Sequence, residues 1–477
     1  MQDLDESLRA LNSRLILLRG KPQDELPLAF ERWGINRMAY EVDIEPYAKT
    51  RDAAIDQLAC KAGVQVLQKV GHTLCDLDML VKRAGGRPLT TYSSFTALLE
   101  KEIRANPISI QPAPSSLPPP IGVSDADISR IPSIEELGYD VSGSSVVVRG
   151  GERAALERMQ AHLDRRDWIA AFEKPSTSPT AHNPFGDGSR STTVLSPYLK
   201  FGCLSARLLY VRLAEVYRAY PKHAKPPVSL HGQLLWREFY YTCAYATPNY
   251  DRMLGNPICR QVPWDKNDEF FRAWRDARTG YPWIDAAMTQ LRREGWIHHL
   301  ARHAVACFLT RGDLWQSWEK GAAVFDELLL DADWAINNGN WMWLSCSCFF
   351  YQYFRCYSPV AFPKKYDKNG DYVRRWLPQL AAFPAKYIYE PWKAPIIDQK
   401  KAGCIIGVDY PKPIVVHETV SKENMGRMAK AYAAHKEATG GVPSMAASSG
   451  AAASSSSSDK RKSSMDTAKQ SKLPRKA

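Results

Sequence analysis

The chain has 477 residues, of which 45% are hydrophobic and 24% are charged, as in an ordinary globular protein of two or three domains. No apolar run reaches the roughly 20 residues of a transmembrane helix, so we expect no membrane partner. The net charge of +12 favours an anionic partner. The ten cysteines show no CxxC pair or regular spacing, which indicates a reducing compartment and argues against a disulfide framework or a metal site.

Residues 1–105 alternate between strand-like and helical patterns. The predicted strands and the helices between them cover residues 14–18, 23–33, 37–42, 49–61 and 64–70. This alternation is typical of βαβ units and predicts an α/β, Rossmann-like parallel-sheet domain. A parallel sheet that starts on a helix would leave an edge and a face uncovered, so we expect its first strand to be missing and the domain to be truncated at its start.

A proline-rich stretch opens the next segment. The prolines between residues 106 and 122 disfavour both helix and central strand, so residues 106–150 are predicted to be an interdomain linker. Residues 151–430 then read as helix almost without interruption and predict a large all-α domain. Its predicted helices cover residues 152–171, 203–220, 230–246, 282–294, 296–309 and 315–330.

The end of the chain is rich in serine, alanine and lysine. Residues 431–477 hold few hydrophobic side chains that could offset the entropy of ordering, so they are predicted to be a disordered tail. Within it, Lys460, Arg461 and Lys462 form a weak candidate for a nuclear-localisation signal. We expect a nuclear protein, with the cytoplasm and the chloroplast as alternatives.

Residues 331–343, DADWAINNGNWMW, form the densest cluster of polar and aromatic side chains. Apolar segments flank the cluster, so its polar groups should be buried and should need partners. For any single residue a satisfied internal network is an equal alternative. For the whole cluster, three asparagines around a glycine weaken a helix, which favours the lining of a cavity for a large ligand with polar edges.

Three histidines form a second cluster. His299 and His303 are one turn apart on a predicted helix, directly after His298. Zinc is disfavoured because Leu300 stands where a metalloprotease has its glutamate and no third ligand is evident. The cluster favours an acid/base pair, with satisfied core histidines as the alternative.

Twelve of the fourteen tryptophans lie between Trp236 and Trp392. Core volume is sufficient to explain most of them, and their spacing alone reveals no electron path.

Five runs of sequence resemble the photolyase/cryptochrome family, in its branch of (6-4) photolyases and animal-type cryptochromes. These runs are residues 191–205, 232–242, 255–267, 279–315 and 331–343. The resemblance implies an N-terminal α/β domain, a helical domain that holds FAD, and chemistry driven by blue or near-UV light. It also implies that the first strand, helix and second strand are absent, which puts in doubt a second, antenna chromophore such as a folate or a deazaflavin.

The resemblance also implies roles for particular residues. Those carried over as FAD-binding are Lys174, Thr192, Thr193, Val194, Leu195, Ser196, Gln233, Arg237, His299, Arg302, Asp331, Ala332, Asp333 and Asn337. Among them, Arg302 and Asp331 resemble an ion pair beside the flavin, Asp333 a flavin-bonding carboxylate, and Asn337 the residue that faces the flavin N5. The residues that resemble a chain of electron donors are Trp341, Trp318, Trp264 and Trp315.

On the substrate side, the resemblance is closest to a (6-4) DNA photolyase. This lyase would repair (6-4) photoproducts by electron transfer from photoexcited reduced FAD, with His299 as the general acid and His303 orienting it. The flipped lesion would lie against Gln233, Trp236, Tyr240, Trp343 and Tyr357. The expected partner is UV-damaged DNA and the expected state is a monomer.

The alternative is an animal-type cryptochrome, a blue-light photoreceptor or transcriptional (circadian) regulator with signalling partners, or a protein with both roles. The histidine pair occurs in both groups and does not separate them. Asn340 and the YSPV run at residues 357–360 favour repair, whereas Cys346 and Cys348 resemble the cryptochrome form. On balance the sequence favours repair.

Overall fold

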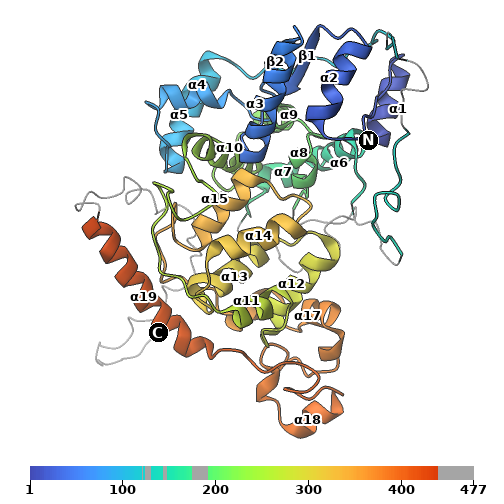
Figure 1. The fold of residues 1–477 in the computed structure, drawn as a ribbon. Helices are drawn as coiled ribbons and strands as arrows, with labels where there is room; N and C mark the ends of the chain where they lie inside the picture. Colours follow the sequence, from blue (N-terminus) through green and yellow to red (C-terminus); the bar gives the residue numbers. More distant parts are fainter. Residues whose placement is uncertain (121, 124–129, 143–147, 175–191, 439–477) are drawn as a thin grey trace, which may run out of the picture.

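The computed structural model describes residues 1–120, 122–123, 130–142, 148–174 and 192–438. The N-terminal elements lie together at one end of the molecule, in blue in Figure 1. In chain order they are α1 Gln2–Ala10, α2 Pro22–Arg32, β1 Arg37–Glu41, α3 Pro46–Lys61, β2 Gln65–Lys69, α4 Leu77–Arg83 and α5 Tyr92–Ala105. The strands β1 and β2 are parallel, with Arg37 opposite Gln65, and α3 makes the crossover between them. The predicted βαβ unit is therefore present.

The strand predicted at residues 14–18 is wrong. In the described part of the chain the sheet has two strands, and the segment between α1 and α2 is irregular. There, the Leu15 amide donates to the Asp5 carboxylate at 2.9 Å. The Leu15 amide is therefore bonded to a side chain of α1 and not to a neighbouring strand. An apolar run of sequence does not reveal such a partner.

After α5, the secondary-structure elements of the described chain are helices. The α-helices among them are α6 Glu152–Leu163, α7 Arg166–Ala171, α8 Ser196–Lys200, α9 Ala206–Ala219, α10 Leu230–Ala246, α11 Asp268–Arg275, α12 Pro282–Glu294, α13 His299–Cys307, α14 Trp318–Leu328, α15 Trp334–Leu344, α16 Ala361–Tyr366, α17 Asp371–Trp376, α18 Ile396–Lys401 and α19 His417–Ala438. The predictions at residues 230–246 and 282–294 match α10 and α12. The helix predicted at residues 152–171 is instead two helices, α6 and α7.

The disorder predicted from residue 431 begins too early, because α19 continues to Ala438. Ala431 is buried, and the Tyr432 hydroxyl donates to the Cys346 carbonyl oxygen at 2.8 Å. These contacts fix a turn of helix whose composition alone looks too polar to order. The remainder of the predicted tail, residues 439–477, lies outside the described residues, as does the basic run at residues 460–462.

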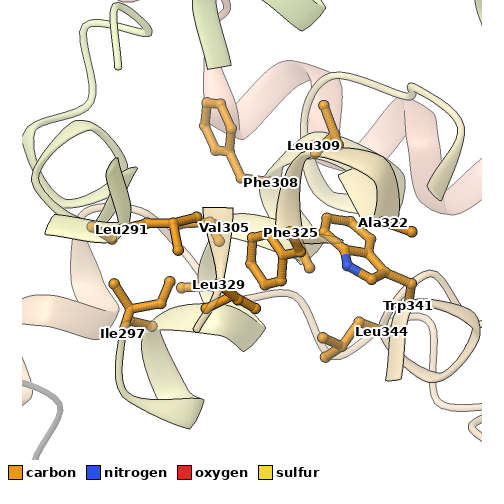
Figure 2. Close-up of a cluster of buried hydrophobic side chains, with 14 of the residues drawn as sticks. Leu291, Ile297, Val305, Phe308, Leu309, Ala322, Phe325, Leu329, Trp341 and Leu344 are labelled. Carbon is orange, nitrogen blue, oxygen red and sulfur yellow. The ribbon is translucent and has the colours of Figure 1, made fainter. Parts of the chain in front are cut away.

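The main core lies where α12, α13, α14 and α15 meet. Figure 2 shows Leu291, Val305, Phe325 and Trp341 converging from these four helices. Trp341 is almost fully buried, and an added Cβ on Gly321 would lie 2.2 Å from its ring. Glycine at position 321 therefore lets α14 and α15 approach closely enough for the Trp341 ring to lie against the α14 backbone.

Candidate functional site

Most of the polar cluster at residues 331–343 lies on one continuous helix, α15, although the three asparagines around a glycine were expected to weaken a helix. Asp333 is its N-cap, and its Oδ1 accepts from the Ile336 amide at 3.0 Å. The Asn338 and Asn340 amides donate to the carbonyls of Trp334 and Ile336, four residues earlier. For these two asparagines the internal-network alternative is correct, because the helix itself satisfies their donors.

Asn337 differs because its amide reaches another helix. Its Nδ2 donates to the Ala322 carbonyl oxygen of α14 at 2.9 Å, and the side chain is buried. Asn337 lies one turn after Asp333, so both side chains lie on one face of α15.

The predicted ion pair between Arg302 and Asp331 is present. The guanidinium is bidentate, with Nη1 to Oδ1 at 3.1 Å and Nη2 to Oδ2 at 3.0 Å. The Ser196 hydroxyl donates to the same Asp331 Oδ2 at 2.6 Å. Asp331, in the segment before α15, is thus bonded to a residue of α8 that lies 135 positions earlier in the chain.

A second cation lies near this pair. Burial, and then the positive charge of Arg302, lowers the pKa of Lys174 to about 8. Two cations held close together in a half-buried site raise the local positive potential, which favours an anion such as a phosphate group.

The loop before α8 contains the predicted phosphate-binding residues. Val194 has a left-handed backbone, with φ 49°, and both Val194 and Leu195 are buried. The Thr193 carbonyl accepts from the Arg158 guanidinium at 2.7 Å, while Thr192 is half-buried. Ser196 is the first residue of α8, so its hydroxyl is free to reach Asp331.

Asp333 has a second set of partners, which the sequence did not indicate. Its Oδ2 accepts from the Tyr241 hydroxyl at 2.6 Å, and the Tyr241 oxygen lies 2.8 Å from Nε2 of His72. Tyr241 is one turn after Arg237 and two turns after Gln233 on α10, so the three share a helix face. That spacing is the only local signal for Tyr241, and no local signal indicates His72.

Arg237 is buried beside this group. Its Nη1 donates to Glu238 at 2.8 Å and its guanidinium lies 4.7 Å from the Tyr241 ring centroid. Its Nη2 is buried and has no hydrogen-bond partner among the described residues. Gln233, one turn earlier, is half-buried. A buried donor of this kind is costly unless an acceptor is supplied from outside the chain.

These residues fit FAD. Lys174 and Arg302 provide positive charge for a pyrophosphate, and the buried Nη2 of Arg237 provides a donor in need of an acceptor. Asp333 and Asn337 offer polar atoms on one face of α15, and Ala332 precedes them in a half-buried position. A surface groove of about 450 Å³, which includes Tyr281, Glu390 and Trp392, shares no residue with this group.

The histidine cluster is present, and its surroundings favour the neutral form of the imidazoles. Burial, and then the charge of Lys174, lowers the pKa of both His298 and His303 to about 3, and the same two causes lower that of His299. Histidines of this kind are neutral at neutral pH and are poor proton donors. Nδ1 of His303 lies 3.1 Å from the Tyr357 hydroxyl, and the His299 and His303 rings are 6.0 Å apart.

The aromatic residues predicted to hold a lesion fall into two groups. Trp236 contacts Tyr240 and Trp343, with ring centroids 5.9 and 5.1 Å away. It also stacks on Tyr92 of α5 at 4.2 Å, a contact from the N-terminal domain that the sequence did not indicate. Tyr357 instead lies with His303, 5.9 Å between ring centroids.

Two of the four predicted electron donors form a pair. Trp264 and Trp315 are 4.9 Å apart, and Trp341 contacts Trp274, which was not predicted, at 6.1 Å. Trp318 begins α14, one turn before the Gly321 against which Trp341 packs. The Arg427 guanidinium of α19 lies 4.3 Å from the Trp315 ring.

Comparisons with known proteins agree with this architecture. Residues 229–430 match the model of the FAD-binding domain of DNA photolyase, and residues 1–118 match that of DNA photolyase. Cryptochrome-1 of Rattus norvegicus is 53% identical over 91% of this chain and 73% of its own length. The crystal structure of a cryptochrome from Synechocystis sp. PCC6803 has a TM-score of 0.72 at 27% identity and covers 89% of this chain and 86% of its own. That of a class III photolyase from Agrobacterium tumefaciens has a TM-score of 0.70 at 28% identity, over 91% and 87%.

The prediction of a (6-4) DNA photolyase is wrong. The curated relatives at 53–54% identity are animal cryptochromes, including those of rat, mouse and chicken. The prediction rested on Asn340 and the YSPV run at residues 357–360, because the histidine pair occurs in both groups and does not separate them. Short runs of this kind separate the two groups less well than similarity along the whole chain does.

Among the residues that the structure describes, no helix is long and apolar enough to cross a membrane, and no group of three His, Cys, Asp or Glu side chains could hold a metal ion. The fold, the two matched domains and the relatives agree with each other and with the cluster of polar residues around α15. The chain belongs to the photolyase/cryptochrome family and contains the family's FAD-binding domain.

Proposed function

We propose that this protein is a blue-light photoreceptor of the animal-cryptochrome type, which signals to other proteins and does not repair DNA. The observation that carries this proposal is the 53% identity to Cryptochrome-1 over 91% of the chain.

In this proposal Lys174, Arg302 and Ser196 bind the phosphate side of FAD, and Asp333 and Asn337 orient its ring. Bound FAD would supply the absorption of blue light and the capacity to accept an electron. The Arg302–Asp331 pair keeps the site ordered because its bidentate geometry permits little rotation of either side chain. The remaining predicted residues, from Thr192 to Leu195 and at Gln233, line the same site.

Trp341, Trp318, Trp264 and Trp315 are proposed to deliver the electron from the surface. The contact of Trp264 with Trp315 supports the outer part of this path. Packing of Trp341 against Gly321, one turn from Trp318, supports the inner part. We propose a nuclear location, which fluorescence of a tagged full-length chain would test.

The proposal is tested with the purified full-length protein loaded with FAD. Under blue light we expect photoreduction of FAD, slowed at least tenfold in Trp341→Phe and unchanged in Trp392→Phe, whose tryptophan borders the surface groove. An oligonucleotide carrying one (6-4) photoproduct should be recovered intact after illumination. Light-dependent loss of that lesion, or failure of the wild-type protein to retain FAD, would refute the proposal.

A reporter assay tests the signalling part. A transcriptional reporter in cells that express the full-length chain should respond to blue light, and should respond less with Trp341→Phe at equal protein abundance. A reporter that never responds, in light or in darkness, would contradict a regulatory role.

A further inference from the structure

Three side chains from separate segments form a hydrogen-bonded chain that ends at Asp333. His72 follows β2 in the N-terminal domain, Tyr241 lies on α10, and Asp333 caps α15. The oxygen of Tyr241 lies 2.8 Å from His72 Nε2 and 2.6 Å from Asp333 Oδ2. Both Tyr241 and Asp333 are buried, so water cannot replace these contacts without a rearrangement of the core.

The chemistry of the three groups fixes which atom donates in each hydrogen bond. An ionised carboxylate only accepts, so the single hydroxyl proton of Tyr241 points to Asp333. The Tyr241 oxygen must then accept from His72, which requires the proton of the neutral imidazole to be on Nε2. Burial, and then the charge of Arg237, lowers the pKa of His72 to about 4, so the neutral form prevails at neutral pH. Protonation would leave Nε2–H in place, and the direction would not change.

The chain is anchored by a second link to the N-terminal domain. The Arg237 guanidinium lies over the Tyr241 ring, and its partner Glu238 is fully buried. Glu238 Oε2 accepts from the Leu74 amide at 2.7 Å, two residues after His72. The segment from His72 to Leu74 thus supports Tyr241 both directly and through Arg237.

Both oxygens of Asp333 are consequently occupied along fixed directions. Oδ1 accepts from the first turn of α15 and Oδ2 accepts from α10. The plane of the carboxylate is set by these two helices together, and each oxygen retains lone-pair capacity for a ligand.

We propose that Tyr241 and His72 are positioning residues, through which the N-terminal α/β domain holds the Asp333 carboxylate in place for FAD and tunes the reduction of the flavin. This inference rests on the proposed function, because it assumes that Asp333 faces bound FAD. The Tyr241 hydroxyl withdraws negative charge from the carboxylate. Without that hydrogen bond the carboxylate is more negative, which disfavours the addition of an electron to a neighbouring ring.

The principal variant is Tyr241→Phe, which removes the hydroxyl and keeps the ring under Arg237. We expect FAD to remain bound and the ratio of reduced to oxidised flavin at a fixed applied potential to fall about tenfold, which is about 59 mV for one electron. Tyr245→Phe is the matched control. Tyr245 is one turn further along α10 and its hydroxyl also contacts the N-terminal domain, donating to Asp78 at 3.1 Å. The control should leave the potential unchanged.

Two substitutions of His72 test its role as a donor. His72→Leu should reproduce the Tyr241→Phe shift, whereas His72→Gln, whose amide can donate to Tyr241, should restore most of the wild-type potential. Loss of packing alone would affect both variants equally, so equal shifts in the two would overturn the role of His72.

A measurement without FAD tests the hydrogen bonds between His72, Tyr241 and Asp333 themselves. In the full-length apoprotein with nitrogen-labelled histidine rings, nuclear magnetic resonance should show His72 as the Nε2–H tautomer near pH 7, with a changed Nε2–H signal in Tyr241→Phe. A His72 protonated on Nδ1 alone would overturn the proposed direction. Retention of FAD with an unchanged potential in Tyr241→Phe would overturn the inference alone, whereas absence of FAD from the wild-type protein would overturn the proposed function as well.

Discussion

Substitution of Gly321 by alanine probes the contact on which the core of the FAD-binding domain depends. An ideal Cβ at this position would lie 2.2, 2.4 and 2.7 Å from three atoms of the Trp341 ring. Because carbon atoms in contact are about 3.5–4.0 Å apart, the ring would have to move by more than about 1 Å. The neighbouring core is closely packed around Phe325 and Leu344, so such a shift disturbs several contacts (Figure 2). Overpacking of this kind costs about 1–3 kcal/mol.

The matched control is Gly426→Ala in α19. Gly426 is also inside a helix, but an added Cβ there meets nothing within 4 Å. Both variants gain about 1 kcal/mol of helix propensity, so the difference between their unfolding free energies reports the clash. We expect Gly426→Ala to be more stable than wild type and Gly321→Ala to be about 1–3 kcal/mol less stable than that control.

Urea unfolding of the apoprotein, followed by far-UV circular dichroism, measures both variants. Trp341→Phe combined with Gly321→Ala should cost less than the sum of the two single changes, because phenylalanine lacks the outer ring atoms that the new methyl group meets. Equal stabilisation by alanine at positions 321 and 426 would refute the reasoning.

Three further predictions concern buried polar groups. Burial lowers the pKa of His162 to about 4, so between pH 6.5 and pH 4 the unfolded chain binds more protons than the folded chain, and the wild-type protein loses stability as the pH falls. His162→Phe removes this loss, which is up to about 3 kcal/mol over that range, and acid-unfolding curves of the two proteins measure the difference. Asn337→Asp should cost about 2 kcal/mol, because an ionised carboxylate would face the Ala322 carbonyl oxygen, and the loss should grow as pH rises, since only the protonated acid can donate. Desolvation raises the pKa of Asp285 to about 6, so the free energy of unfolding declines as pH rises through that value. Tyr410→Phe removes a hydrogen-bond donor to Asp285 and should lower the free energy of unfolding by about 1–2 kcal/mol. Urea unfolding should show a larger loss at pH 8, where Asp285 is ionised, than at pH 5.

The helices that the sequence predicted most accurately carry strong signals at their ends. α12 begins with Pro282 in its first turn and ends at Gly295, which has a left-handed backbone. α10 begins after Ser229, whose hydroxyl accepts from the Gly232 amide. Signals of this kind are local, and so they can be read from the letters. The apolar run at residues 14–18 has no such signal, and its structure depends on a distant partner, Asp5.

The same distinction separates the site residues that were predicted from those that were missed. Arg302 and Asp331 were predicted through a resemblance between long motifs, and the structure brings them together. Tyr241 and His72 were missed because their roles depend on the approach of α10, α15 and the segment after β2. The periodicity of a single segment does not report hydrogen bonds that join three separate segments.

The activity was harder to predict than the site because repair and photoreception require the same residues around FAD. A repair enzyme and a photoreceptor both need the cations near Asp331, the carboxylate of Asp333 and a path for an electron. Repair would in addition need a proton donor at the histidine cluster, but His299 and His303 occur in both groups. The charge of Lys174, which together with burial lowers the pKa of His303 to about 3, belongs to one of the cations that both activities need. The local chemistry therefore indicates the family, and it is similarity along the whole chain that favours the photoreceptor.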